Sequence, residues 1–314
     1  EHSARGSMLN PMGPVAQVTR AVDLDIESQL RASAPLQDYA ARLGKSAPAT
    51  PAAAAVPAPA RRSEALRPSY RVSERPDDLA IVVGVTKYAD LPEALYAEED
   101  AAAVREHLAA LGVPARNLIH LAGARATRTS LTKFIETWLP NNARPGSRVY
   151  FYFSGHGAPD PKSGDSYLVP VDGDPNYLAD TGYSLRELYA RLAASGAKEA
   201  VVMLDACFSG AGGRSVLAKG ARPLVVRREA PEAPPASVTV LAAAAEDQIT
   251  SAHEASGHGL FTYYLLKGLD GGAGARVTAA SLLRWAAPKV ADEARRQNRE
   301  QTPALAGADL TLRD

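Results

Sequence analysis

The chain has 314 residues, 46% of them hydrophobic, which suffices for the core of one large domain with a tail or of two modest domains. Lys and Arg number 35, as do Asp and Glu, so net charge gives no reason to expect nucleic acid or an anionic membrane as partner. A single cysteine, Cys207, excludes an internal disulfide framework and a zinc site built on several thiolates. No apolar run approaches the roughly 18–20 residues needed to cross a bilayer.

Three segments of different composition precede the main domain. Residues 1–7 resemble an expression-vector remnant and end in Gly6-Ser7 before Met8. Residues 8–45 carry apolar side chains at loosely helical spacing and predict one helix or two short ones. Residues 46–76 are rich in Ala and Pro and predict an extended or disordered linker. A start at Met8 leaves no signal peptide and predicts a cytoplasmic protein, whereas a chain trimmed upstream would leave the localisation open.

From residue 77 to residue 314, short apolar runs alternate with helical patterns. Continuous apolar runs suit strands that are buried on both faces of a parallel sheet. The expected strands span residues 79–85, 149–153, 200–204 and 238–241. The expected helices span residues 98–111, 130–139, 184–194, 259–269 and 279–297. This alternation predicts an α/β fold with a mostly parallel central sheet that is flanked by helices on both faces.

Reactive side chains follow two of the expected strands. His156 comes just after the 149–153 strand in Ser-Gly-His-Gly, and Cys207 follows the 200–204 strand in Asp-Ala-Cys-Phe-Ser-Gly. Because ligands bind at the carboxyl ends of parallel strands, neighbouring strands would place both side chains on one rim. A thiol attacks as thiolate, and an imidazole can take its proton. The alternative for Cys207 is a small buried hydrophobe, which is the commoner role of a lone cysteine.

Other catalytic motifs fail on spacing. His258 comes five positions after His253, whereas the zinc-binding His-Glu-x-x-His motif of metalloproteases needs a spacing of four to place both histidines on one helix face. The chain also lacks a Gly-x-Ser-x-Gly elbow and a phosphate loop. The remaining histidines are most simply tag, surface or structural residues, and they are His2, His107, His120, His253 and His258.

Several segments together resemble the caspase–metacaspase clan of cysteine peptidases, and its bacterial metacaspase-like (orthocaspase) branch in particular. The nucleophile motif sits 207 − 156 = 51 positions after the histidine, which fits the caspase signature. The other matching segments lie at residues 81–85, 97–101, 153–157, 167–172, 258–262 and 301–303. The resemblance covers residues 77–312 and implies a caspase-like fold. It divides into a large-subunit-like part (77–210), a linker loop (211–236) and a small-subunit-like part (237–314).

The resemblance implies a mechanism for this site. Cys207 would attack a peptide carbonyl, and His156 would protonate the leaving amine. The backbone N–H groups of Gly157 and Cys207 would hold the tetrahedral oxyanion, an interaction worth about 3–4 kcal/mol of barrier in other hydrolases. The alternative function is a catalytically inactive caspase-like scaffold or interaction module that keeps the fold for binding.

By resemblance, acidic residues would bind a basic side chain before the scissile bond. Asp205 and Asp100 match the family positions, and Asp247 is a weaker third candidate. Paired carboxylates suit the fork of Arg, and also Lys, so the expected substrates are proteins or peptides cut after Arg or Lys. The alternative for Asp100 is a helix N-terminal carboxylate that favours the helix dipole, and for Asp205 it is a buried turn cap.

No cofactor is expected. Many eukaryotic metacaspases need calcium, which prefers six to eight oxygen ligands. The aspartates after His156 are spread over loops without the spacing of a calcium motif, and no acidic residue occurs between Phe208 and Arg228. Calcium independence is therefore the expectation, with calcium binding as the alternative. The aspartates concerned are Asp160, Asp165, Asp172, Asp174 and Asp180.

The loop after the nucleophile predicts self-processing. It is rich in Gly, Ala and Pro, and such exposed loops are the usual sites of nicking. A basic-specific enzyme would meet its own preferred side chains there, with Lys219, Arg227 and Arg228 as candidate sites. The alternative is a solvated basic loop with no role in activation. Segment 8–45 is expected to dock on the catalytic domain, recruit a partner or inhibit the enzyme.

Overall fold

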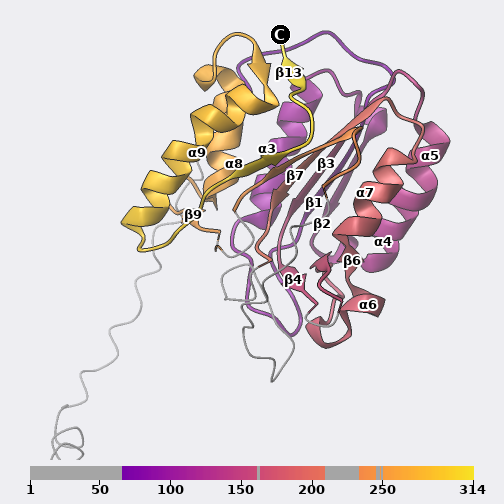
Figure 1. Ribbon diagram of the computed structural model, residues 1–314, viewed down its shortest axis with the longest axis vertical. Helices are drawn as coiled ribbons and strands as arrows, with labels where there is room; N and C mark the ends of the chain where they lie inside the picture. The colour runs from indigo at the N-terminus through magenta and orange to yellow at the C-terminus, as the bar shows by residue number, and fades with distance from the viewer. Residues whose placement is uncertain (1–65, 161–162, 209–232, 245–247, 249) are drawn as a thin grey trace, which may run out of the picture. The chain divides into compact units, whose positions relative to one another are not determined.

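A computed structural model of the chain describes residues 66–160, 163–208, 233–244, 248 and 250–314 (Figure 1). The chain divides into two compact units, Glu1–Ala60 and Arg61–Asp314, and all the described residues belong to the second unit. The predicted remnant at residues 1–7 and the predicted helical segment at residues 8–45 lie outside the described residues. Within the described part, no helix combines the length and the apolar character that a membrane crossing requires.

A six-stranded sheet with the order β12-β8-β7-β3-β1-β2 forms the centre of the described part. Five strands run parallel, and β12 pairs antiparallel with β8 at one edge. The strands are β1 (Leu79–Gly84), β2 (Leu118–Ala122), β3 (Arg148–Ser154), β7 (Glu199–Asp205), β8 (Val238–Ala242) and β12 (Ala304–Ala306). The mostly parallel sheet that the apolar runs predict is therefore confirmed.

Helices cover both faces of this sheet (Figure 1). On one face lie α3 (Ala97–Ala110), α8 (Leu260–Lys267) and α9 (Ala279–Arg296), and on the other lie α4 (Arg128–Thr132), α5 (Leu139–Asn142) and α7 (Leu185–Ala193). Because successive strand residues point to opposite faces, β1 contributes to two cores. Val82 packs in the core with Val104 of α3, whereas Ile81 packs in the core with Leu188 of α7.

Shorter elements fill the connections. Three small antiparallel sheets pair β4 with β5 and β6, β9 with β10, and β11 with β13. Their bounds are β4 (Gly157–Pro159), β5 (Ser166–Leu168), β6 (Tyr183–Ser184), β9 (Ala252–His253), β10 (His258–Gly259), β11 (Val277–Thr278) and β13 (Thr311–Arg313). The remaining helical turns are η1 (Ala115–Asn117), η2 (Gly123–Arg125), η3 (Lys133–Trp138), η4 (Pro175–Tyr177), α6 (Leu178–Thr181) and η5 (Gly268–Gly272).

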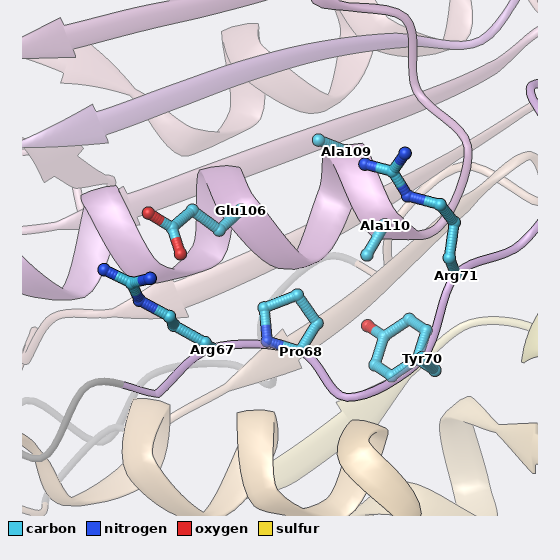
Figure 2. A pocket seen from close by; sticks show the side chains of 7 residues that line it. All are labelled: Arg67, Pro68, Tyr70, Arg71, Glu106, Ala109 and Ala110. Carbon is cyan, nitrogen blue, oxygen red and sulfur yellow. The ribbon is translucent and has the colours of Figure 1, made fainter.

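The end of the expected linker packs on the domain. Leu66 is 6% exposed and belongs to the core beneath α3, and Tyr70 and Val72 pack against the same core. The Val72 N–H donates to the Ala110 carbonyl at 2.7 Å. The apolar side chains at positions 66, 70 and 72 explain why this stretch contacts α3 despite its place beside an Ala/Pro-rich segment. Pocket residues Arg67, Pro68 and Arg71 line the seam between this stretch and α3 (Figure 2).

His107 of α3 anchors this stretch. Its Nε2 lies 3.0 Å from the Leu66 carbonyl oxygen, and its Nδ1 lies 3.1 Å from the Tyr70 hydroxyl. The neutral ring satisfies both contacts, because Nε2–H donates to the carbonyl and Nδ1 accepts from the hydroxyl. Burial lowers the pKa of His107 from 6.5 to about 4, with the Leu66 carbonyl and Asp270 opposing the shift. The ring therefore stays neutral in the folded protein at pH values where it is charged in the unfolded chain.

The lower pKa of His107 in the folded protein predicts that acid destabilises the fold. As the pH falls from 6.5 toward 4, the unfolded chain binds a proton at His107 and the folded chain does not, so the free energy of unfolding falls. Relative to His107→Gln, the wild-type protein is expected to lose about 2–3 kcal/mol between pH 7.5 and pH 4.5. Urea unfolding of both proteins at several pH values measures this. A stability difference that is constant over that range would contradict a neutral buried His107.

Candidate active site

The loop after β1 holds His156 just beyond the end of β3. The His156 side chain is fully buried, and its Nε2 lies 2.6 Å from the Pro92 carbonyl oxygen. A carbonyl can only accept, so Nε2 carries the proton and donates it to Pro92. In the neutral ring this tautomer leaves Nδ1 as the basic nitrogen. The loop therefore orients the imidazole and selects which nitrogen can exchange a proton.

Tyr88 of the same loop clamps the backbone of this histidine. Its hydroxyl accepts from the His156 N–H at 2.9 Å and donates to the Val169 carbonyl at 3.1 Å. The two rings lie 4.8 Å apart between centroids. Gly155 permits this approach, because a Cβ there would come within 2.7 Å of the Tyr88 hydroxyl oxygen. A side chain at position 155 would therefore collide with Tyr88, which explains the first glycine of the Ser-Gly-His-Gly turn.

Cys207 lies at the equivalent place after the neighbouring strand. Strands β3 and β7 pair directly, and Ser154 lies opposite Asp205 at the end of the pairing. His156 comes two residues after Ser154, and Cys207 comes two residues after Asp205. The Cys207 side chain is 1% exposed. Its Sγ accepts from the Thr250 N–H at 2.7 Å and donates to the Thr250 hydroxyl at 3.0 Å. The expectation that both residues sit at ends of neighbouring strands is confirmed.

The two turns that carry these residues touch one another. A Cβ added to Gly157, the first residue of β4, would come within 2.4 Å of the Cys207 carbonyl oxygen and 2.6 Å of the Phe208 ring. Only a glycine fits this approach without displacement of backbone. The turn after His156 therefore lies directly against the backbone of Cys207. The predicted oxyanion role of the Gly157 and Cys207 N–H groups stays a prediction.

Asp100 and Asp205 come together beneath this rim, and both side chains are fully buried. They converge on Gly259, where an added Cβ would lie 2.4 Å from Asp205 Oδ2 and 2.8 Å from Asp100 Oδ2. Gly259 directly precedes α8. Because the N-terminus of a helix favours negative charge, its position explains how two carboxylates can be held side by side in a buried site.

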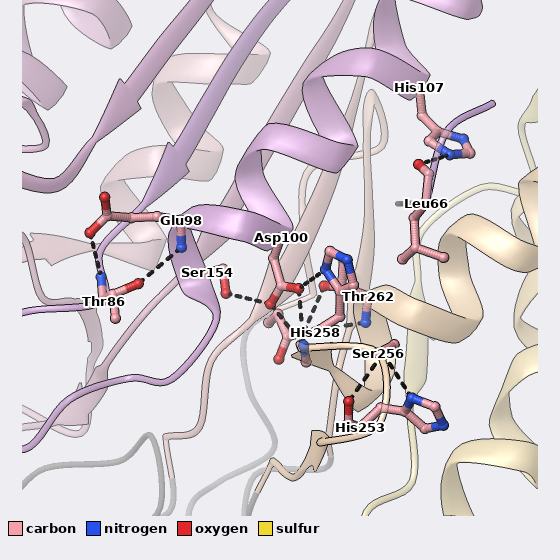
Figure 3. A network of polar contacts seen from close by, with 12 residues as sticks. Leu66, Thr86, Glu98, Asp100, His107, Ser154, His253, Ser256, His258 and Thr262 are labelled. Carbon is pink, nitrogen blue, oxygen red and sulfur yellow. Dashed lines mark hydrogen bonds and ion pairs between the residues drawn. The ribbon is translucent and has the colours of Figure 1, made fainter. Parts of the chain in front are cut away.

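Hydrogen bonds fix the orientation of both carboxylates. Asp100 accepts from the Gly259 N–H at 3.0 and 3.1 Å. It also lies 2.9 Å from His258 Nδ1 and accepts from the Ser154 hydroxyl at 3.3 Å (Figure 3). Asp205 Oδ2 accepts from the Thr262 hydroxyl at 2.6 Å and from the Thr262 N–H at 3.3 Å. Asp100 also lies in the first turn of α3, as its alternative interpretation supposes. The substrate-binding role of the pair stays a prediction.

The aspartates that follow His156 mostly serve turns and ion pairs. Asp160 accepts from the Ser163 hydroxyl and N–H, Asp165 pairs with Arg186, and Asp172 accepts from the Arg128 N–H. Asp174 caps the turn at Asn176, whereas Asp180 is exposed. Among the described residues, no three His, Cys, Asp or Glu side chains gather in a way that could hold a metal ion.

Four further predicted residues lie outside the described residues. They are Asp247, Lys219, Arg227 and Arg228. Sequence reasoning, in turn, missed the contacts of Tyr88, Pro92, Thr250 and His258. His258 was expected to be a tag, surface or structural residue, and the structure finds it 3% exposed and bound to a predicted substrate-binding carboxylate. Its place in the 258–262 segment beside Gly259 was the one signal that could have found it.

A histidine and a cysteine at the ends of adjacent parallel strands, joined by touching turns, characterise a caspase-like cysteine peptidase. A family model for the caspase domain matches residues 77–313, so the chain belongs to the caspase-domain family. A probable protease from a Desulfuromonadales bacterium is 29% identical over 223 residues, which is 63% of this chain. The match covers 26% of that longer relative.

Solved structures show the same fold. The crystal structure of a Geobacter sulfurreducens protein matches with a TM-score of 0.55 at 18% identity, covering 76% of this chain and 98% of that one. Caspase-1 from Spodoptera frugiperda matches with a TM-score of 0.51 at 16% identity, covering 76% of this chain and 89% of that one. The predicted clan and the predicted caspase-like fold are thereby confirmed.

Proposed function

We propose that the domain is a metacaspase-type endopeptidase in which Cys207 and His156 form a catalytic dyad. The observation that carries the proposal is the pairing of β3 with β7, which brings the two turns into contact at the carboxyl edge of the sheet. A substrate carbonyl that lies over this edge meets the thiol from one turn and the imidazole from the other.

The reaction follows from the tautomer of His156. Cys207 loses its proton to the imidazole, and the thiolate attacks the carbonyl carbon to form a tetrahedral oxyanion. His156 Nδ1–H then protonates the leaving amine as the C–N bond breaks and a thioester forms. Water, deprotonated by Nδ1, hydrolyses the thioester and restores the thiol. The Pro92 carbonyl accepts from Nε2–H throughout, so it supports the cationic ring while the proton is held.

The backbone N–H groups of Gly157 and Cys207 are the proposed donors to the oxyanion. Each such donor contributes roughly 3–4 kcal/mol of barrier reduction in other hydrolases. The contact between Gly157 and the Cys207 backbone supports this part of the proposal, because the two donors belong to segments that already touch.

The proposed substrates carry Arg or Lys before the scissile bond. Asp100 and Asp205 supply two carboxylates within one buried site, and a low local dielectric strengthens the attraction of a cation to them. Arg can also donate to both through its planar fork. Asp247 is proposed as a third acidic contributor from the segment before Thr250. Calcium is proposed not to be required, and self-processing is proposed at Lys219, Arg227 or Arg228.

A panel of fluorogenic peptides tests this function. The peptides differ only in the residue before the reporter, which is Arg, Lys, Asp or Ala, and each is assayed with and without EDTA. We expect Arg and Lys peptides to be cleaved at least about 100-fold faster than the Asp peptide, as loss of a buried charge pair implies. Cys207→Ala is expected to cleave none. Preference for Asp would contradict the acidic site, and no turnover by the wild-type protein would favour the scaffold alternative.

A further inference from the structure

Thr250 contacts the nucleophile through two separate groups. Its N–H donates to Cys207 Sγ at 2.7 Å, and its hydroxyl oxygen accepts from the thiol at 3.0 Å. Thr250 is 4% exposed, so both contacts are shielded from water. It lies 43 positions after the cysteine, on the segment that leads into β9. No part of the dyad mechanism requires this residue.

A buried network holds Thr250 in place. The neighbouring Ser251 N–H donates to Gln301 Oε1 at 2.8 Å, and Gln301 Nε2 donates to the Ala243 carbonyl at 3.0 Å. The Ser251 carbonyl accepts from the Leu260 N–H at the start of α8. Gln301 is itself 1% exposed. Thr250 is therefore braced both from the end of β8 and from α8, and its position relative to the thiol is well determined.

We propose that Thr250 is a positioning residue that aims Cys207 Sγ and stabilises its thiolate. The inference rests on the proposed function of Cys207 as nucleophile. When the S–H bond breaks, the proton passes to His156 Nδ1, and the products are a thiolate and an imidazolium. The Thr250 hydroxyl then rotates from acceptor to donor, so the thiolate receives hydrogen bonds from both the hydroxyl and the N–H. Donors to the charged form favour that form.

Alkylation by iodoacetamide reports on this thiolate directly. Cys207 is the only cysteine of the chain, so intact mass gives a rate that belongs to this thiol alone. Rates measured between pH 5 and pH 10 yield a midpoint, which reports ionisation, and a plateau, which reports access. Neither quantity depends on peptide cleavage.

Thr250→Val removes the hydroxyl while it keeps the shape and the N–H. We expect its alkylation midpoint to rise by about one pH unit, which corresponds to roughly tenfold less thiolate near neutrality, while the plateau stays within about twofold of wild type. Thr250→Ala should shift the midpoint equally, and Thr250→Ser should rescue it. Thr129→Val, the same change at an exposed position of α4 on the opposite face of the sheet, should leave the midpoint unchanged.

Two results would overturn the inference. One is an unchanged midpoint in both Thr250→Val and Thr250→Ala. The other is a plateau that rises tenfold or more with an unchanged midpoint, since Thr250 would then only cover the thiol. If the wild-type protein cleaves no peptide, the proposed function fails, while the alkylation profiles still decide the role of Thr250.

Discussion

Alanine at His156 is expected to lower kcat/KM for an Arg reporter by about 10³-fold or more in a protein that remains folded. The imidazole is the proposed acceptor of the thiol proton and the donor to the leaving amine, and general acid–base catalysis of this kind contributes about 10²–10⁴-fold. Loss of the ring also removes a titrating group from the site, so the residual rate should follow the ionisation of the Cys207 thiol alone. Initial rates over pH 5–9 measure both effects.

Controls separate this effect from damage to the fold. His120→Ala changes a histidine on β2, which lies two strands away from β3 in the sheet, and should keep at least half of the activity. Cys207→Ala should cleave no reporter, and adding His156→Ala to it should cause no further loss, because residues that act as a unit are not additive. Retention of more than a tenth of wild-type kcat/KM by His156→Ala would refute the dyad.

The central sheet and its helices were predictable because their patterns are long and local. The expected strand at 79–85 and the expected helices at 98–111 and 279–297 agree within one residue with β1, α3 and α9. Strand β2 was missed because His120 interrupts its apolar run and most of its residues are only partly buried. The strands from β4 to β6 have two or three residues each, too few to show an alternating pattern.

Within the site, the sequence predicted the reactive side chains but not the groups that contact them. His156 and Cys207 each lie in a glycine-containing turn directly after an apolar strand, and this pattern can be recognised in the sequence alone. The contact of the imidazole with Pro92 could not be predicted, since any residue supplies a carbonyl and 64 positions separate the two. The contact of Thr250 with Cys207 could not be predicted either, because its N–H is a backbone group and no motif marks its hydroxyl as reactive. Tertiary packing alone decides these contacts.

Replacing Asp205 with asparagine is expected to lower kcat/KM for Arg and Lys reporters by about 100-fold, mostly through KM. The substitution removes one buried negative charge, and losing one partner of a buried charge pair costs about 2–5 kcal/mol. Asn keeps the size of the side chain, so the contact with Thr262 can persist through its amide oxygen. Asp100→Asn should behave alike and should also weaken the contact with His258.

Alkylation of Cys207 distinguishes a loss of substrate binding from a change in the reactivity of the thiol. In Asp205→Asn the alkylation midpoint should not rise, because removing a buried negative charge two residues from Cys207 favours the thiolate. The plateau should match wild type. Asp292→Asn, a change at an exposed carboxylate paired with Arg295, should leave both cleavage and alkylation unaltered. If Asp205→Asn cleaves Arg peptides with an unchanged KM, the carboxylate supports only the start of α8, and the basic side chain of the substrate must be recognised elsewhere.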